Sequence, residues 1–259
     1  MLLAIDIGNS TTKFGIFDGS DLLDRFSIPT AQNYSIEELE FGRLLRPAGR
    51  FLGIDRVIVS SVVPGFDKMI GQAIRKNLNV EPRFVDHTFD FGLKLKYEPP
   101  EAAGIDRLIN ASAAARKYGV PVIACSFGTA TTFDLVTRDM EYAGGAIAPG
   151  LRMMAEALYR GTAKLPPVSV DEPKSPIGTT TEDSIRSGVY FGYVGLVKGI
   201  LEKLLNELDT KPVIIGTGGF AGVAAKHVSM INTIDDSLTL DGLRMLSDAQ
   251  NVEPHQATL

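Results

Sequence analysis

Short apolar runs bounded by glycine, aspartate or proline recur along the first half of the chain, and each predicts a buried strand. Segments with helical spacing of apolar positions lie between them. Pro64 opens one such segment, Gly119 follows another, and Ser35 with Glu38 resembles a further helix start. The expected strands are residues 2–7, 13–17, 22–28, 56–60 and 82–85, and the expected helices are residues 64–77 and 102–118.

From residue 120 the same succession of patterns begins again. Three strand-like runs at 120–125, 131–137 and 141–147 repeat the opening of the chain, and a proline-containing stretch at 159–178 predicts an ordered surface loop. The other expected elements are a strand at 213–215 and helices at 150–158, 181–208, 220–226 and 238–246. The repetition indicates a duplicated unit with a boundary near residue 118.

Each half carries one glycine-rich turn directly after its first strand. The first turn runs from Asp6 to Thr12 (Asp-Ile-Gly-Asn-Ser-Thr-Thr) and the second from Ser126 to Thr132 (Ser-Phe-Gly-Thr-Ala-Thr-Thr). Glycine lets the backbone approach a ligand closely, and turn N–H groups with hydroxyls suit phosphate oxygens. Two such turns facing each other can clamp a nucleoside triphosphate.

This duplication predicts an α/β protein built from two actin-like (ribonuclease H-like) domains, residues 1–118 and 119–259. Each domain is expected to hold a mixed sheet with flanking helices, and the nucleotide is expected in the cleft between them. Two unrelated α/β domains would give similar patterns, so the duplication by itself leaves that alternative open.

Asp6 ends the first apolar run. A carboxylate at this point can hold Mg²⁺ next to phosphates, directly or through water. The alternative is an aspartate that caps its own turn by accepting N–H bonds. Lys13 is placed either to reach a phosphate or to be a solvated lysine on the strand.

A second candidate site lies at the predicted start of the helix over residues 102–118. Gly104 allows a close approach, and Asp106 with Arg107 follows in the first helical turn. The helix dipole favours an ionised carboxylate there, which can accept a proton from a substrate hydroxyl, while a guanidinium can hold an anionic group. The simpler alternative is dipole complementation plus a surface ion pair.

Composition narrows the classes of partner. The 259 residues are 44% hydrophobic, which supports sizeable cores, and the net charge of −5 gives no support for nucleic acid or an anionic membrane. The single cysteine, Cys125, lies in an apolar run, so we expect a buried structural thiol in a cytoplasmic protein. No signal peptide, membrane span or zinc site is expected.

The motifs resemble those of the type III pantothenate kinases, the bacterial enzymes at the first step of coenzyme A synthesis. The resemblance extends over nearly the whole chain, and it rests on the order and spacing of short motifs. These are Asp6 to Ser10, Ser60-Ser61-Val62-Val63-Pro64, Tyr97 with Pro99, Gly104 to Arg107, Phe127 to Thr131, Gly144 to Gly150, Thr181, and Leu238 to Leu243.

The resemblance implies an ATP-dependent kinase that converts pantothenate to 4′-phosphopantothenate, with Asp106 as the general base. It also implies a homodimer, in which Thr181 reaches pantothenate across the interface, and a need for Mg²⁺ at Asp6 and for K⁺ or NH₄⁺. The implied ATP-binding residues are Asp6, Ile7, Gly8, Asn9, Ser10, Thr11, Thr12, Lys13 and Thr129. The implied pantothenate-binding residues are Tyr97, Gly104, Ile105, Asp106, Arg107 and Thr181.

One position departs from the family pattern. The second loop of the family begins with an aspartate that binds the monovalent cation, and Ser126 stands there in this chain. A hydroxyl is a neutral and weaker cation ligand, so we expect weakened or altered K⁺ dependence. This leaves open a non-catalytic or weakly active homologue with a binding or regulatory role, against which the intact Asp6, Asp106 and Arg107 argue. A kinase of another small hydroxy compound is also open, although Tyr97 with Gly104 to Arg107 favours pantothenate.

Overall fold

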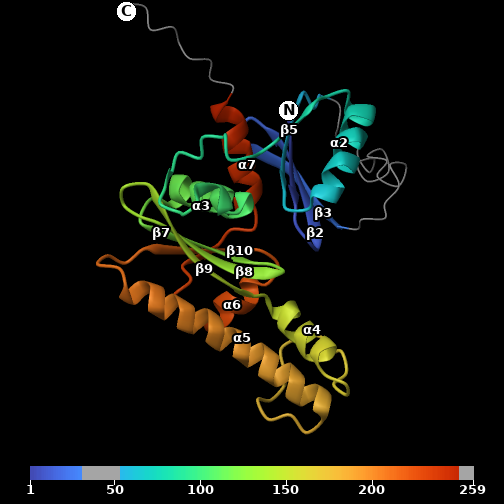
Figure 1. The fold of residues 1–259 in the computed structure, drawn as a ribbon, viewed down its shortest axis with the longest axis vertical. Coiled ribbons are helices and arrows are strands. Elements are labelled where there is room, and N and C mark those ends of the chain that lie inside the picture. The colour runs from blue at the N-terminus through green and yellow to red at the C-terminus, as the bar shows by residue number, and fades with distance from the viewer. Residues whose placement is uncertain (31–52, 251–259) are drawn as a thin grey trace, which may run out of the picture. The chain divides into compact units, whose positions relative to one another are not determined.

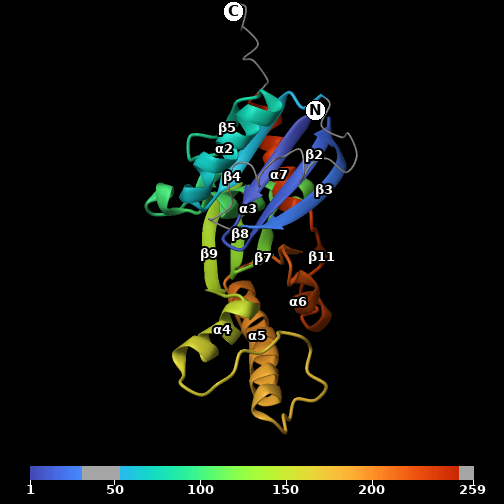
Figure 2. The ribbon, with the colours of Figure 1, turned by 90° about the vertical axis from the view of Figure 1, so that its right-hand side faces the viewer.

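The computed structural model describes residues 1–30 and 53–250, and Figures 1 and 2 show it from two directions. The chain divides into two compact units. Unit 1 takes the described residues of Met1–Gly92, Glu101–Ala113 and Leu238–Leu259, and unit 2 takes Leu93–Pro100 and Ala114–Ser237. These units are not continuous halves of the chain, and the domain boundary at residue 118 stays a prediction. The expected helix start at Ser35 lies outside the described residues.

The sheet of unit 1 has five strands in the order β3-β2-β1-β4-β5. Its central strand, β1, is buried along its whole length, as the apolar run predicts. β1 (Leu2–Ile7), β2 (Thr11–Asp18) and β3 (Asp21–Pro29) form an antiparallel meander, while β4 (Arg56–Ser61) is parallel to β1 and β5 (Pro82–Phe84) is parallel to β4.

Helices cover both faces of this sheet (Figure 1). α2 (Pro64–Leu78) packs Phe66, Ile70 and Ile74 into a core with alternate residues of the strands. α7 (Leu238–Ala249) lies on the other face, where Leu240 meets Gly15. α3 (Ile105–Tyr118) packs against α7 in turn, because the Thr239 hydroxyl donates to Asn110 Oδ1 at 2.8 Å. Both α3 and α7 therefore lie on the sheet face that carries Asp6.

The sheet of unit 2 has six strands in the order β11-β10-β7-β8-β9-β6. β7 (Val122–Phe127), β8 (Ala130–Val136) and β9 (Glu141–Pro149) form the meander, β10 (Val213–Thr217) is parallel to β7, and β11 (Thr233–Ile234) is parallel to β10. β6 (Lys94–Leu95) adds an outer strand parallel to β9. Without β6, the order and directions match those of unit 1, and the predicted duplication is confirmed.

Three helices cover one face of the second sheet: α4 (Leu151–Gly161), α5 (Thr181–Asn206) and α6 (Ala221–His227). Their apolar residues form one core with the β7 and β8 residues Cys125, Phe127 and Phe133. Val189, Val194 and Leu196 of α5 pack into or against this core, whereas Phe191 is exposed. Burial and the nearby Asp134 carboxylate raise the pKa of the Cys125 thiol, so this cysteine is structural, as predicted.

The short elements escaped the sequence analysis. β6 and β11 have two residues each, and a 3₁₀ turn (Pro100–Ala102) precedes α3, which begins at Ile105 rather than at residue 102. Two residues are too few to show a periodicity. Within the described residues, no helix has the length and apolar character needed to cross a membrane.

Candidate active site

In unit 1, three polar side chains form a row across neighbouring strands. Asp6 at the end of β1 pairs in register with Lys13 of β2 and with Ser60 of β4. Register partners point to the same face of a sheet. The Lys13 ammonium lies 3.8 Å from Asp6 Oδ2, so this lysine is half-buried beside a carboxylate and is not a freely solvated strand residue. The buried Ser60 hydroxyl has no hydrogen-bond partner among the described residues.

Asp6 is buried, with 9% of the residue exposed. Burial raises its pKa from 3.8 to about 6; the Lys13 ammonium lowers the pKa, and the Asp106 carboxylate raises it. Because Asp106 affects the pKa of Asp6, the two carboxylates lie close enough within unit 1 to interact electrostatically. Two carboxylates and one lysine suit a site for a cation, or for a phosphate group that is bound together with a cation.

The turn after β1 closes through its backbone. The Gly8 N–H donates to the Thr11 carbonyl at 3.1 Å, and the Thr30 N–H donates to the Ser10 carbonyl at 3.0 Å. The Asn9, Ser10 and Thr11 side chains are exposed, in agreement with a ligand-facing turn. Ile7 and Thr12 are completely buried, and the Thr12 hydroxyl bonds to that of Thr30 at 2.8 Å. Those two residues therefore have only their backbone to offer a ligand.

The start of α3 holds the second candidate group of unit 1. The Leu108 N–H donates to the Gly104 carbonyl at 3.0 Å, which makes Gly104 the residue just before the helix. A Cβ atom at Gly104 would lie 2.8 Å from Asp106 Oδ1. A side chain at this position would therefore displace the carboxylate. Arg107 is 5% exposed, which excludes the surface ion pair considered from the sequence.

In unit 2, the second glycine-rich turn has the same construction as the first. The Gly128 N–H donates to the Ala130 carbonyl at 3.0 Å, as Gly8 does in its own turn. The Thr129 carbonyl accepts from the Gly150 N–H at 3.0 Å, and a Cβ atom at Gly150 would lie 2.3 Å from the Gly128 and Thr129 carbonyl oxygens. Only glycine allows the end of β9 to support the turn so closely, and Thr129 remains exposed.

Ser126 lies in a row of neutral hydroxyls. It pairs in register with Thr217 of β10 on one side and with Thr132 of β8 on the other. Thr217 is 1% exposed, and its hydroxyl lacks a hydrogen-bond partner in the described part of the chain. Neutral hydroxyls therefore surround the position where the resemblance leads us to expect an aspartate. The Thr217 hydroxyl is the one that could bind a water molecule or an ion.

The two remaining predicted residues also belong to unit 2. Tyr97 follows β6, is half-buried, and lies beside Tyr142 with ring centroids 5.9 Å apart. Thr181 is exposed in the first turn of α5. The Thr180 hydroxyl caps that helix by accepting from the Asp183 N–H at 3.1 Å. The capping role considered for Thr181 therefore belongs to its neighbour, and the Thr181 side chain faces solvent.

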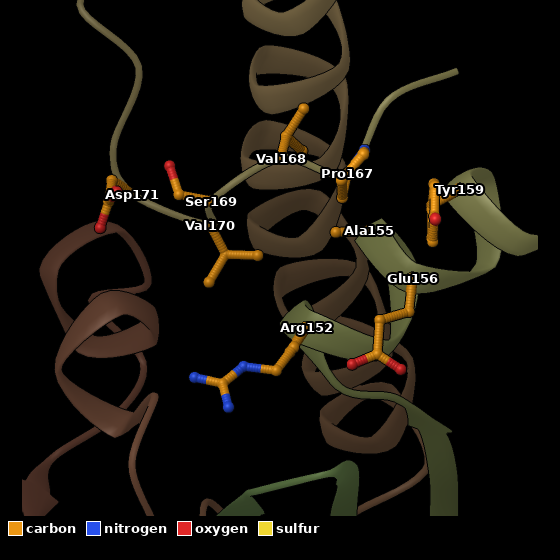
Figure 3. Close-up of a pocket in the computed structure, with 9 residues that line it drawn as sticks. All are labelled: Arg152, Ala155, Glu156, Tyr159, Pro167, Val168, Ser169, Val170 and Asp171. Carbon is orange, nitrogen blue, oxygen red and sulfur yellow. The ribbon is translucent and has the colours of Figure 1, made fainter. Parts of the chain in front are cut away.

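A pocket of about 390 Å³ lies elsewhere in unit 2, between α4 and the segment that follows it (Figure 3). Figure 3 shows Arg152 and Glu156 on α4 beside an apolar wall that includes Val168 and Val170. None of the nine residues that line it is among the predicted site residues. The pocket is therefore separate from the candidate site.

Comparison with known proteins settles the family. The family model for type III pantothenate kinases matches residues 2–203. The chain belongs to the type III pantothenate kinase family. The type III pantothenate kinase of Finegoldia magna is 42% identical over 256 residues, which cover 96% of this chain and 97% of the relative.

Solved structures agree with an actin-like fold for this type III pantothenate kinase family member. A Baf family protein from Campylobacter jejuni has a TM-score of 0.57 and 18% identity, covering 96% of this chain and 98% of its own. An inorganic polyphosphate/ATP-glucomannokinase from an Arthrobacter strain has a TM-score of 0.50 and 16% identity, again with 96% and 98% covered. At these identities the likeness concerns the fold, which is actin-like as predicted.

Sequence reasoning missed two hydroxyl groups that lie beside the predicted metal-binding residues of this kinase family member. Ser60 enters the sequence analysis only as part of a motif, and Thr217 follows a predicted strand without being singled out. Each lies next to a predicted metal position because of strand register between distant segments. A serine or threonine at the carboxyl end of a buried parallel strand was the available sign.

Proposed function

We propose that this chain transfers the γ-phosphoryl group of ATP to the primary hydroxyl of pantothenate, giving 4′-phosphopantothenate and ADP at the first step of coenzyme A synthesis. Membership of the type III pantothenate kinase family over most of the chain carries the proposal. The grouping of Asp6, Lys13 and Asp106 in unit 1 supports it, because phosphoryl transfer depends on positioning and on neutralising charge.

In this mechanism Asp106 is the general base. The pantothenate oxygen forms a bond to the γ-phosphorus, the bond from that phosphorus to the bridging oxygen breaks, and ADP leaves. The hydroxyl proton passes to the Asp106 carboxylate, which lies in the first turn of α3 beside the side-chain-free Gly104. Arg107, buried next to it, orients the anionic substrate, and Tyr97 and Thr181 are the further residues proposed to bind pantothenate.

The residues around Asp6 fit a hydrated Mg²⁺ ion. Mg²⁺ prefers oxygen ligands and keeps several waters, and here a nearly buried carboxylate lies in register with an unpartnered Ser60 hydroxyl. When bound, Mg²⁺ neutralises phosphate charge. The backbone of residues 7–12 and the Asn9 and Ser10 side chains hold the phosphates, Lys13 adds a positive charge, and Thr129 contributes from the second turn.

The family resemblance also calls for a monovalent cation at Ser126, and the neutral hydroxyls there are weak ligands for it. We predict shallow activation of the wild-type chain by K⁺, and a steeper, tighter activation once a carboxylate is restored by Ser126→Asp. The measurement is the rate of ADP release against K⁺ concentration at constant ionic strength. Equal, saturable K⁺ activation of the two proteins would contradict the prediction.

Two further properties follow the family. We propose a homodimer that brings Thr181 of one protomer to the pantothenate of the other, with α5 as the source of the interface through residues such as Phe191. Sedimentation of a monomer at assay concentrations would contradict it.

We also place the protein in the cytoplasm, where the single thiol stays reduced. Recovery in another cell fraction would contradict that placement.

The test of the function is a coupled assay for ADP release with MgATP and pantothenate. Turnover that requires pantothenate supports the kinase. Ser126 favours a second candidate, a homologue that binds ligands without turnover and acts on a partner. One outcome is a wild-type protein that folds and binds nucleotide without releasing pantothenate-dependent ADP. If Ser126→Asp then restores turnover, the chain is a kinase disabled at this position. Failure of that rescue would favour the binding role.

A further inference from the structure

A buried carboxylate in unit 2 lies outside every role assigned above. Asp134 of β8 is 1% exposed and accepts two hydroxyl hydrogen bonds. The Tyr142 hydroxyl donates to Oδ1 at 2.8 Å, and the Thr132 hydroxyl donates to Oδ2 at 2.9 Å. Burying an ionisable group without partners is costly. The two hydroxyl hydrogen bonds offset that cost for Asp134, and they also fix the Tyr142 and Thr132 side chains.

The Asp134–Tyr142 pair leads directly to Tyr97. The Tyr142 ring is completely buried, and its centroid lies 5.9 Å from that of Tyr97, with the two planes tilted by 49°. The backbone continues the connection, because the Lys96 N–H donates to the Tyr142 carbonyl at 3.0 Å. Tyr97 is therefore supported both by the ring of Tyr142 and by the strand pairing of the segment before it.

Gly144 supplies a further contact to Tyr97. The register between β8 and β9 shifts at Leu135 and Val136, which pair with Gly144 and Tyr142, so Ala143 is the additional residue of a bulge. Bulges redirect neighbouring side chains. Gly144 has a φ of +83°, and a Cβ atom there would lie 3.2 Å from the Tyr97 ring. The ring thus lies over backbone that only glycine leaves open.

We infer that Asp134, through Tyr142 and together with Gly144, sets the position of the Tyr97 ring and so determines affinity for pantothenate. Asp134, Tyr142 and Gly144 are positioning residues, since none of them has to touch the substrate. The inference rests on the proposed function, in which Tyr97 lines the pantothenate pocket. It adds that a distinct set of buried residues controls that side of the pocket.

Removing one hydroxyl tests this. Tyr142→Phe deletes the bond to Asp134 and keeps the ring. We expect the KM for pantothenate to rise about 3- to 10-fold, the effect of one lost buried hydrogen bond on ring position, with little change in kcat or in the KM for MgATP. Calorimetric titration with pantothenate alone should show the same loss of affinity.

The chain offers a matched control. The Tyr118 hydroxyl donates to the Asp235 carboxylate at 2.9 Å, a pair of the same chemistry elsewhere in unit 2. Tyr118→Phe removes a partly buried bond to a carboxylate that keeps its ion pair with Lys117, so it should lower the melting temperature no more than Tyr142→Phe and leave both KM values unchanged. Gly144→Ala, if it folds, should raise the pantothenate KM selectively by pressing a methyl group on Tyr97.

Three results are distinguishable. A selective rise in the pantothenate KM for Tyr142→Phe supports the inference. Loss of thermal stability with an unchanged pantothenate KM and affinity, as for Tyr118→Phe, would overturn it and leave the kinase in place. A wild-type protein that neither binds nor phosphorylates pantothenate would overturn the proposed function and this inference with it.

Discussion

Replacing Asp106 by asparagine should lower kcat by about 10²–10⁴-fold, the usual contribution of a general base. The amide keeps the size of the side chain and can still hydrogen-bond the pantothenate hydroxyl, but it cannot accept the proton when the O–P bond forms. The KM values for pantothenate and MgATP should change much less than kcat. The measurement is the rate of ADP release at saturating concentrations of both substrates.

Asp67 provides the control for this variant. It lies in the first turn of α2 in the same unit, is half-buried as Asp106 is, and takes no part in the proposed site. Asp67→Asn should alter stability through the helix dipole and leave kcat unchanged. Near-normal turnover of Asp106→Asn would remove Asp106 from the role of base, and an equal loss of kcat in Asp67→Asn would show that the effect is not specific.

Replacing Asp6 by asparagine should make the ligand-free protein more stable at pH 8 while disabling the enzyme. Folding raises the pKa of Asp6 from 3.8 to about 6, so between these values the folded state binds more protons than the unfolded state. The free energy of unfolding therefore falls as pH rises through this window, and above it the ionised group costs the folded state about 1–3 kcal/mol. Asparagine avoids that cost.

The pH dependence identifies the cause. The gain in melting temperature of Asp6→Asn should be several degrees at pH 8 and should become small near pH 4, where the carboxyl is protonated in the folded state and about half protonated in the unfolded state. Turnover with MgATP should fall about 10- to 100-fold, the usual effect of losing a group that orients a metal. Asp18→Asn, at the exposed end of β2, should change neither quantity. A gain for Asp6→Asn that is equal at pH 4 and pH 8, or absent, would contradict the expected burial cost.

Local pattern was enough for the main elements and for the repeated order of strands. β1 is found over residues 2–7 as expected, because the apolar residues of this segment are followed by the glycine-containing turn that begins at Gly8. The location of Asp106 near the start of a helix also followed from local pattern, because aspartate is favoured at the positive end of the helix dipole. These features depend on neighbours within a few residues, and so they are visible in the sequence.

Features that depend on distant pairing were not predictable in this way. Ser60 lies beside Asp6, and Thr217 beside Ser126, only because parallel strands are aligned in a particular register. The same holds for Gly150, whose bare Cα supports the Gly128–Thr129 turn from the end of β9. No periodicity records such an alignment, because it is fixed by the closing of the whole sheet.

The strand order described for unit 1 also bears on how the protein behaves when concentrated. An outer strand offers unpaired N–H and C=O groups to other molecules and is a common starting point for aggregation. At one side of this sheet the outer strand, β3, carries Asp21, Asp24 and Arg25, whose charges oppose stacking of copies. At the other side β5 is only three residues long. Both margins of this sheet are therefore poor templates for the addition of a strand from another copy of the chain.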